Sequence, residues 1–94
     1  GKAEELDIFK GAKKYAADRL ELYNAIATHE KAKAARRGGG GNPKGATAHR
    51  YRELTGAWPP RSYDFHAAPA VTPSRELQGK LRSMEIAFAR GMRK

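Results

Sequence analysis

The chain has 94 residues and a mass of 10.3 kDa, so it can form at most one domain with one modest core. Its 19 Lys and Arg residues outnumber 10 Asp and Glu residues, and the net charge of +9 favours polyanionic partners such as nucleic acid. Cysteine is absent, which excludes disulfides, thiol nucleophiles and cysteine-ligated zinc and favours a cytoplasmic location.

Residues 3–37 have the pattern of a long helix that ends at a glycine run. An apolar stripe follows this segment at steps of three and four residues and consists of Phe9, Ala12, Ala16, Leu20, Tyr23 and Ala27. Leu22 and Ile26 broaden this stripe. Gly11 could divide this segment, so the domain would contain three helices or four. Four consecutive glycines at 38–41 predict the end of the helix and a flexible joint.

A second helix is predicted over 43–55. Asn42 is a good N-cap, Pro43 fits the first helical position, and Gly56 follows the last turn. The apolar positions of this helix are Thr47, Tyr51 and Leu54. The Trp-Pro-Pro sequence that comes next stops the helix, which predicts a loop over 56–72.

The last helix is predicted over 73–91, because Thr72 and Pro73 repeat the signal of a cap followed by proline. Its apolar stripe consists of Leu77, Leu81, Met84 and Phe88. The sequence contains no convincing strand. It therefore predicts a single all-α domain over 1–94, a small three- or four-helix domain with a Gly-rich joint and a Trp-Pro-Pro loop.

Positive charge is spread along the chain, with a mild peak in the last helix. Contacts to phosphate groups require Lys and Arg side chains on a common face. The candidates lie around the second helix (Lys44, Arg50, Arg52 and Arg61) and on the last helix (Arg75, Lys80, Arg82, Arg90, Arg93 and Lys94). The alternative is a solvated basic face that keeps the chain in solution.

Aromatic residues gather in a short segment and alternate with arginines: His49, Tyr51, Trp58, Tyr63, Phe65 and His66. Aromatic rings beside guanidinium groups suit stacking on unpaired bases, and we expect Tyr63 or Phe65 of the loop to make this contact. Tyr51 and Trp58 have two interpretations. They are either core residues that anchor the loop or part of a contact surface.

Catalytic, metal and membrane sites are not expected. The chain lacks the GxxxxGK[ST], GxSxG and HExxH motifs, which predicts no enzymatic activity. Its histidines, His29, His49 and His66, stand 20 and 17 residues apart with no acidic residue at ligand spacing, so we expect no metal and no other cofactor. No apolar run is long enough to span a membrane or to form a signal peptide. The first helix is basic but its apolar side is mostly alanine, which disfavours a membrane-surface role.

Residues 42–63 read Asn-Pro-Lys-Gly-Ala-Thr-Ala-His-Arg-Tyr-Arg-Glu-Leu-Thr-Gly-Ala-Trp-Pro-Pro-Arg-Ser-Tyr. This segment resembles the C-terminal region of bacterial and phage DEAD/DEAH-box superfamily 2 helicases of the RadD type. The matching residues are Lys44, Gly45, Ala46, Ala48, His49, Tyr51, Arg52, Glu53, Gly56, Trp58 and Pro59. The segments 22–37 and 83–90 are also similar, so the resemblance covers about 70 of the 94 residues.

Because the motor's own motifs are absent from these residues, the resemblance implies either an accessory domain of a longer helicase or a free-standing relative of such a domain, with a role in DNA repair. The leading hypothesis is a nucleic-acid-binding domain that uses phosphate contacts, prefers DNA to RNA and positions a helicase motor. The alternative is a protein-interaction module that holds an acidic tail, such as that of a single-strand binding protein, or docks on the motor. Only 13 of 94 residues are Val, Ile, Leu or Phe, and a core so poor in aliphatic residues often requires a partner. A third possibility is a basic helical linker without a dedicated site.

Overall fold

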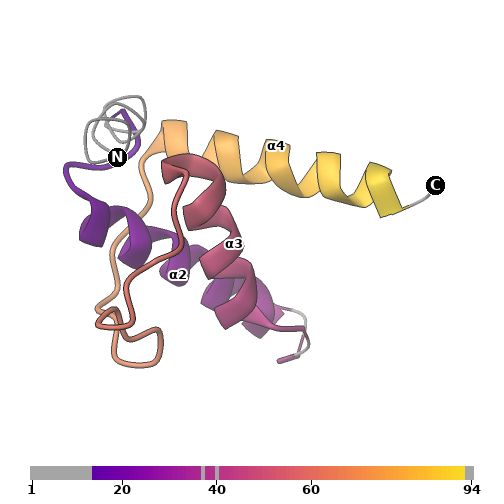
Figure 1. Ribbon diagram of the computed structural model, residues 1–94. Helices are drawn as coiled ribbons and strands as arrows, with labels where there is room; N and C mark the ends of the chain where they lie inside the picture. Colours follow the sequence, from indigo (N-terminus) through magenta and orange to yellow (C-terminus); the bar gives the residue numbers. More distant parts are fainter. Residues whose placement is uncertain (1–13, 37, 40, 93–94) are drawn as a thin grey trace.

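Three helices form the described part of this protein. The computed structural model describes the backbone of residues 14–36, 38–39 and 41–92, with side chains as far as residue 87. The helices are α2 (Arg19–Arg36), α3 (Pro43–Thr55) and α4 (Arg75–Met92), and these residues contain no strand, which confirms the all-α fold class. The helices α2 and α3 pack on each other, whereas the C-terminal half of α4 extends away from both (Figure 1).

The helix α2 starts later than the apolar pattern predicts. Asp18 Oδ1 accepts a hydrogen bond from the Glu21 backbone N–H at 2.8 Å, and Glu21 Oε2 accepts one from the Ala17 N–H at 2.6 Å. Such a reciprocal arrangement resembles a capping box, which marks a helix N-terminus. Residues 14–18 are therefore turns and bends, and the prediction of one helix from residue 3 is wrong over this part. Residues 1–13, with Gly11, lie outside the described residues.

Two glycines of the predicted joint end α2. The Gly38 N–H donates to the Ala35 carbonyl at 3.1 Å, and the Gly39 N–H donates to the Ala34 carbonyl at 2.7 Å. Both glycines have positive φ angles, 76° and 88°, which a residue with a Cβ adopts only with strain. The carbonyls of the last turn of α2 thereby receive partners after the helical path has ended.

The helix α3 has the bounds that its local signals predict. Asn42 Oδ1 accepts from the Gly45 N–H at 3.1 Å, and Pro43 occupies the first helical position. At the other end Gly56 has a φ of 81°, and its N–H donates to the Arg52 carbonyl at 2.7 Å. Both termini are thus satisfied by residues within four positions along the chain.

The helix α4 begins at Arg75, two residues later than predicted, and its N-cap is Ser74 rather than Thr72. Ser74 Oγ accepts from the Leu77 N–H at 3.2 Å. The same hydroxyl donates to the Tyr15 carbonyl at 3.2 Å, so this cap also joins the start of α4 to the segment before α2. The loop therefore extends to residue 74.

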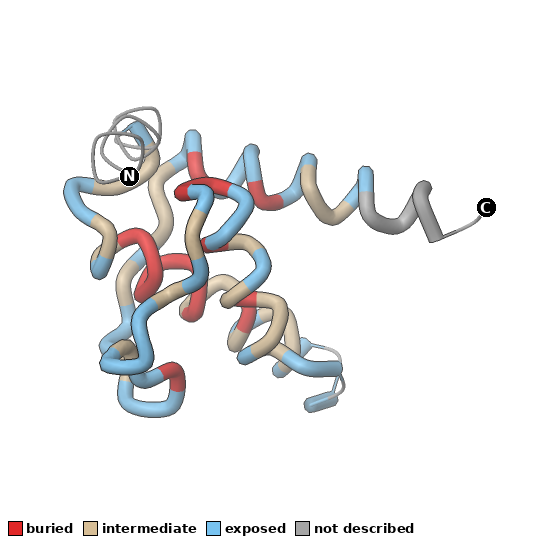
Figure 2. The backbone as a smooth tube through the Cα atoms, viewed as in Figure 1, coloured by how far each residue is buried: buried red, intermediate tan, exposed pale blue. Residues whose placement is uncertain are grey.

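The core lies between α2, α3 and the first half of α4, where Figure 2 shows the buried segments. Its buried apolar residues are Leu22, Tyr23, Ala25, Ile26, Ala27, Tyr51, Leu54, Phe65, Leu77 and Leu81. The apolar positions of α3, Thr47, Tyr51 and Leu54, are all buried. Leu20 was expected on the stripe of α2 but is 48% exposed. It lies in the first turn of α2, whereas Tyr23 and Ala27, further along the same stripe, are buried.

Candidate nucleic-acid interface

Three arginines line one open cleft of about 520 Å³ between α2 and α4. Arg36 comes from the last turn of α2, and Arg75 and Arg82 come from α4. The remaining lining residues are His29, Gln78, Gly79 and Glu85. We call this the arginine cleft. The sequence indicated Arg75 and Arg82 but not Arg36, which joins them only because α2 and α4 approach each other.

The guanidinium groups of the arginine cleft are exposed, and none of them is paired with a carboxylate in the part of the chain that the structure describes. The one acidic residue of the cleft, Glu85, is already engaged, with Lys33 Nζ at 2.7 Å and His29 Nε2 at 3.3 Å from its Oε1. Burial raises the pKa of Glu85, but the hydrogen bonds and charges of Lys33 and His29 outweigh burial and hold it below its usual range. The cleft therefore offers excess positive charge to an anion.

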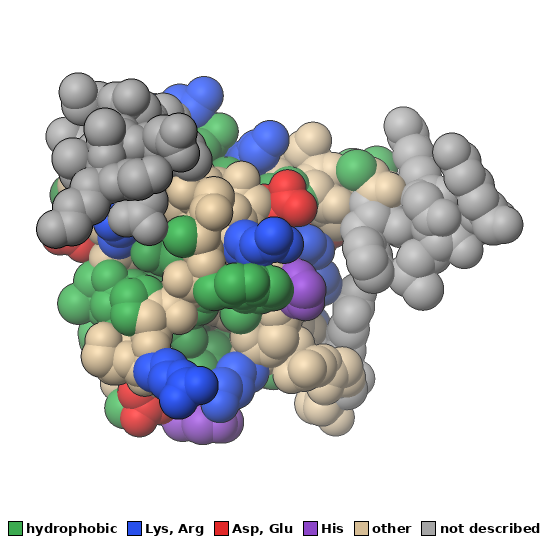
Figure 3. Space-filling model, in the orientation of Figure 1, with side chains coloured by type: hydrophobic (Ala, Val, Ile, Leu, Met, Phe, Trp, Pro, Cys, Tyr) green, Lys and Arg blue, Asp and Glu red, His purple; other side chains and the backbone are tan. Residues whose placement is uncertain are grey.

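An exposed tryptophan forms the second part of the candidate interface. Trp58 is 53% exposed and follows the C-terminus of α3, so its ring lies over two side chains of that helix. The Arg52 guanidinium carbon is 4.9 Å from the centre of the Trp58 ring, and the His49 ring centre is 5.1 Å from it at an interplanar angle of 70°. We call these three residues the indole cluster. In the face shown in Figure 3, hydrophobic surface lies directly beside Lys or Arg side chains and a histidine.

Trp58 also borders a smaller cleft of about 200 Å³, lined by Arg19, Tyr51, Thr55, Ala57, Trp58, Pro60 and Tyr63. Behind it the rings of Tyr23, Tyr51 and Tyr63 pack together, with centres 5.3 to 6.2 Å apart. Burial raises the pKa of Tyr51 to about 12, with smaller contributions from Tyr63, while the charge of Arg19 acts in the opposite direction. The structure thus separates the two aromatic residues that the sequence left undecided: Tyr51 belongs to the core and Trp58 to the surface.

The other aromatic candidates are less accessible than expected. Phe65 is only 5% exposed and belongs to the core, so the expectation that it stacks on a base is wrong. Lys31 Nζ lies 4.8 Å from the centre of its ring. Tyr63 is half-buried, because its ring packs on Tyr23 and Tyr51. The loop turns inward at these two residues to supply apolar surface that the helices lack.

The remaining cationic candidates do not join either group. Lys44 lies on the first turn of α3, at the opposite end from Trp58, and Arg61 lies in the loop. Lys80 is exposed on α4 but does not line the arginine cleft. Arg50 is half-buried, and its Nε has no hydrogen-bond partner among the described residues. The side chain of Arg90 lies outside the described ones, as do Arg93 and Lys94.

Comparison with protein-family models, with curated proteins and with solved structures finds no match. Among the described residues, no helix combines the length and the apolar character needed to cross a membrane.

Proposed function

We propose that this chain is a non-catalytic accessory domain that binds single-stranded nucleic acid, with DNA as the preferred partner, for a helicase-type protein. The observation that carries the proposal is the convergence of Arg36, Arg75 and Arg82 on one open cleft. Guanidinium groups bind phosphate oxygens through two parallel hydrogen bonds, and three of them can follow successive phosphates of one strand. The net charge of +9 supplies long-range attraction to the same partner.

The indole cluster supports a preference for single strands. Among the residues whose side chains the structure describes, the Trp58 ring is the large aromatic surface that stays accessible, and the Arg52 guanidinium lies against it. Unpaired bases stack on such rings, and each stacked base contributes roughly 1 to 3 kcal/mol. Bases within a duplex are already stacked on their neighbours, so they gain nothing from Trp58.

The phosphate contacts are tested by fluorescence anisotropy with labelled single-stranded and duplex DNA. If three counterions are released, raising the salt from about 50 to 200 mM should weaken single-strand binding roughly 20-fold. Gly79 offers a matched pair of variants, because a Cβ added there meets no atom within 4 Å. Gly79→Glu places a carboxylate in the arginine cleft and should weaken binding, whereas Gly79→Ala should not. Binding that is insensitive to both salt and Gly79→Glu would overturn the proposal.

The stacking contact has its own reporter, because Trp58 is the single tryptophan of the chain. Single-stranded DNA should quench its fluorescence, whereas an abasic strand with the same phosphates should bind without quenching. Trp58→Ala should weaken binding of the natural strand roughly 5- to 160-fold and leave the abasic strand unaffected. Equal losses for both strands would remove the stacking role from the proposal.

An acidic peptide is the competitor that separates nucleic-acid binding from the protein-interaction alternative. The arginine cleft can bind carboxylates by the same paired hydrogen bonds, but a peptide has no bases for Trp58. We expect the peptide to bind more weakly than the strand and without quenching. A peptide that matches or exceeds the strand in affinity would identify the chain as an interaction module for an acidic tail.

A further inference from the structure

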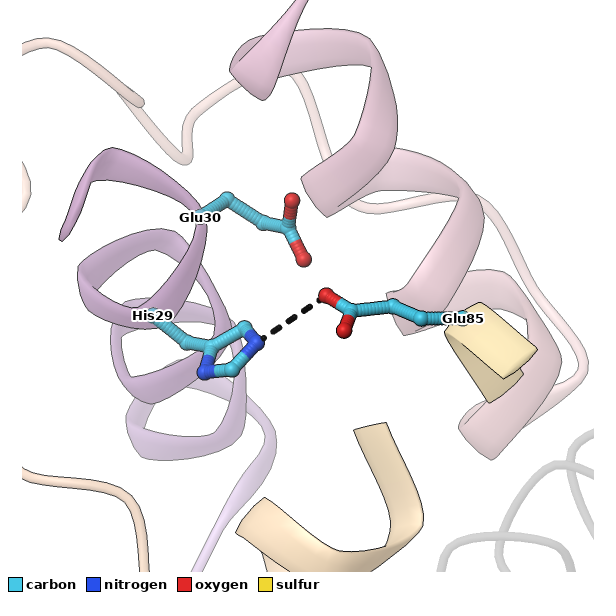
Figure 4. Close-up of side chains that lie close together, drawn as sticks. All are labelled: His29, Glu30 and Glu85. Carbon is cyan, nitrogen blue, oxygen red and sulfur yellow. Dashed lines mark hydrogen bonds and ion pairs between the residues drawn. The ribbon is translucent and has the colours of Figure 1, made fainter. Parts of the chain in front are cut away.

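We infer that His29, Glu30 and Glu85 form a binding site for a divalent transition-metal cation such as Zn²⁺. The two neighbouring residues of α2 and the one residue of α4 point toward one another in Figure 4. Each offers one ligand atom, and these atoms all lie within 4.8 Å of one another. The inference does not depend on nucleic-acid binding.

The separations are close to those of a tetrahedral zinc site. Ligand atoms that are each about 2.0 Å from a tetrahedral Zn²⁺ lie about 3.3 Å from one another. His29 Nε2 and Glu85 Oε1 already have this separation, 3.3 Å. The third ligand atom, from Glu30, lies within 4.8 Å of the other two, so it needs a movement of about 1.5 Å at most, which rotation of the carboxylate can supply.

Glu30 is the buried member of the cluster, and one of its two carboxylate oxygens has no partner in the part of the chain that the structure describes. Glu30 is only 3% exposed, yet its Oε2 has no hydrogen-bond partner among the described residues. A buried carboxylate oxygen without a partner is costly, and a cation bound to this carboxylate would relieve that cost. Figure 4 shows that the Glu30 carboxylate faces Glu85, which is the direction from which the cation would bind it.

Access to the cluster is open from two sides. His29 and Glu85 line the arginine cleft, and Glu30 lines a second, smaller cleft of about 70 Å³ at the start of α3. A cation can therefore arrive from solvent and keep a water molecule as its fourth ligand. One imidazole and two carboxylates suit Zn²⁺ or Mn²⁺, whereas Mg²⁺ requires about six oxygen ligands.

Lys33 is the internal competitor for this site. Its Nζ is 2.7 Å from Glu85 Oε1 and 3.9 Å from Glu30 Oε1, and it balances one of the two negative charges. Zn²⁺ would have to displace this ammonium, whose side chain is 20% exposed and can turn toward solvent. Loss of the Lys33 ammonium should therefore strengthen Zn²⁺ binding, although it removes a hydrogen bond to Glu85.

The test is calorimetric titration of ZnCl₂ into the chelator-treated 94-residue chain. We expect one equivalent of Zn²⁺ to bind. His29→Gln, Glu30→Gln and Glu85→Gln should each weaken binding by more than about tenfold, whereas Lys33→Gln should tighten it several-fold. His66→Gln removes an exposed imidazole outside the cluster and is the matched control, which should bind as the unaltered chain does.

Circular dichroism of each variant shows whether the fold is kept. Glu85, on the outer wall of the cluster, provides the variant that tests the site even if the buried Glu30→Gln fails to fold. Failure of both the unaltered chain and Lys33→Gln to bind Zn²⁺ would overturn the inference. One-equivalent binding that survives in Glu85→Gln and His29→Gln would overturn it as well, because the ion would then be held elsewhere.

Discussion

The α2–α3 pair and the helix α4 are held in different ways. Between α2 and α3 the contacts are apolar and aromatic, with Leu22 and Ile26 fully buried and Tyr51 2% exposed. The residues of α4 that are fully buried in this core, Leu77 and Leu81, both lie in its first half. Beyond Leu81, Met84 packs on the core while only partly buried, Glu85 makes polar contacts to α2, and the helix extends past the other two (Figure 1).

The difference matters for the arginine cleft, because its walls come from both regions. Apolar burial holds α2 and α3 in one arrangement, whereas polar contacts at a half-exposed position are weaker and more easily exchanged. The width of the cleft therefore depends on the part of the molecule that is held least firmly.

The largest effect on stability is expected in the α2–α3 pair. Ile26→Ala should lower the free energy of unfolding by about 3 to 4 kcal/mol, because the side chain is fully buried and its removal leaves a cavity. Urea denaturation measures the change. Leu20→Ala on the same helix is the control and should change it by less than about 1 kcal/mol, since Leu20 is 48% exposed. Similar losses for the two variants would contradict the placement of Ile26 in the core and of Leu20 at the surface.

Alkaline pH should also destabilise the α2–α3 pair. Because the pKa of Tyr51 is raised to about 12 in the folded chain, the unfolded chain releases this proton first, near pH 10. The free energy of unfolding should therefore fall by about 2 to 3 kcal/mol as the pH rises from 10 toward 12. Denaturation at a series of pH values measures the slope. Tyr51→Phe cannot titrate and should have a flatter profile; an unchanged slope would show that Tyr51 does not cause it.

The attachment of α4 is tested at its first turn. Ser74→Ala should destabilise the chain by about 1 kcal/mol, because Ser74 Oγ accepts from Leu77 and also donates to the Tyr15 carbonyl. Thr72→Ala is the control, since Thr72 is exposed and outside the helix. Thermal denaturation of the two variants compares them. A larger loss for Thr72→Ala would place the N-cap where the sequence pattern had predicted it.

The smallest effect is expected at the far contact of α4. Glu85→Gln in the presence of a chelator should lower global stability by less than about 1 kcal/mol, because its partners are near the surface. Hydrogen exchange is the more sensitive measurement: amides of α4 after Leu81 should exchange faster, while those of α2 should not change. Equal acceleration in both helices would mean that the two regions unfold as one unit.

Local signals in the sequence were sufficient for much of the fold. The bounds of α3 follow from Asn42, Pro43 and Gly56, because caps act over three or four residues and need no distant partner. The start of α2 was missed although its signal was present: Asp18 and Glu21 have capping-box spacing, and the long apolar pattern obscured it. The exposure of Leu20 does not follow from local spacing, since Tyr23 and Ala27 on the same stripe are buried.

The candidate sites required the tertiary structure. Spacing along the chain could not show that Tyr51 is buried and Trp58 exposed, because this depends on the direction in which the loop leaves α3. It could not bring Arg36 to Arg75, or His29 to Glu85, which is 56 residues further along the chain. The physical reason is that helix type and termini are decided by neighbours within a few residues, whereas a cleft or a ligand set is decided by which helix faces meet once the core has formed.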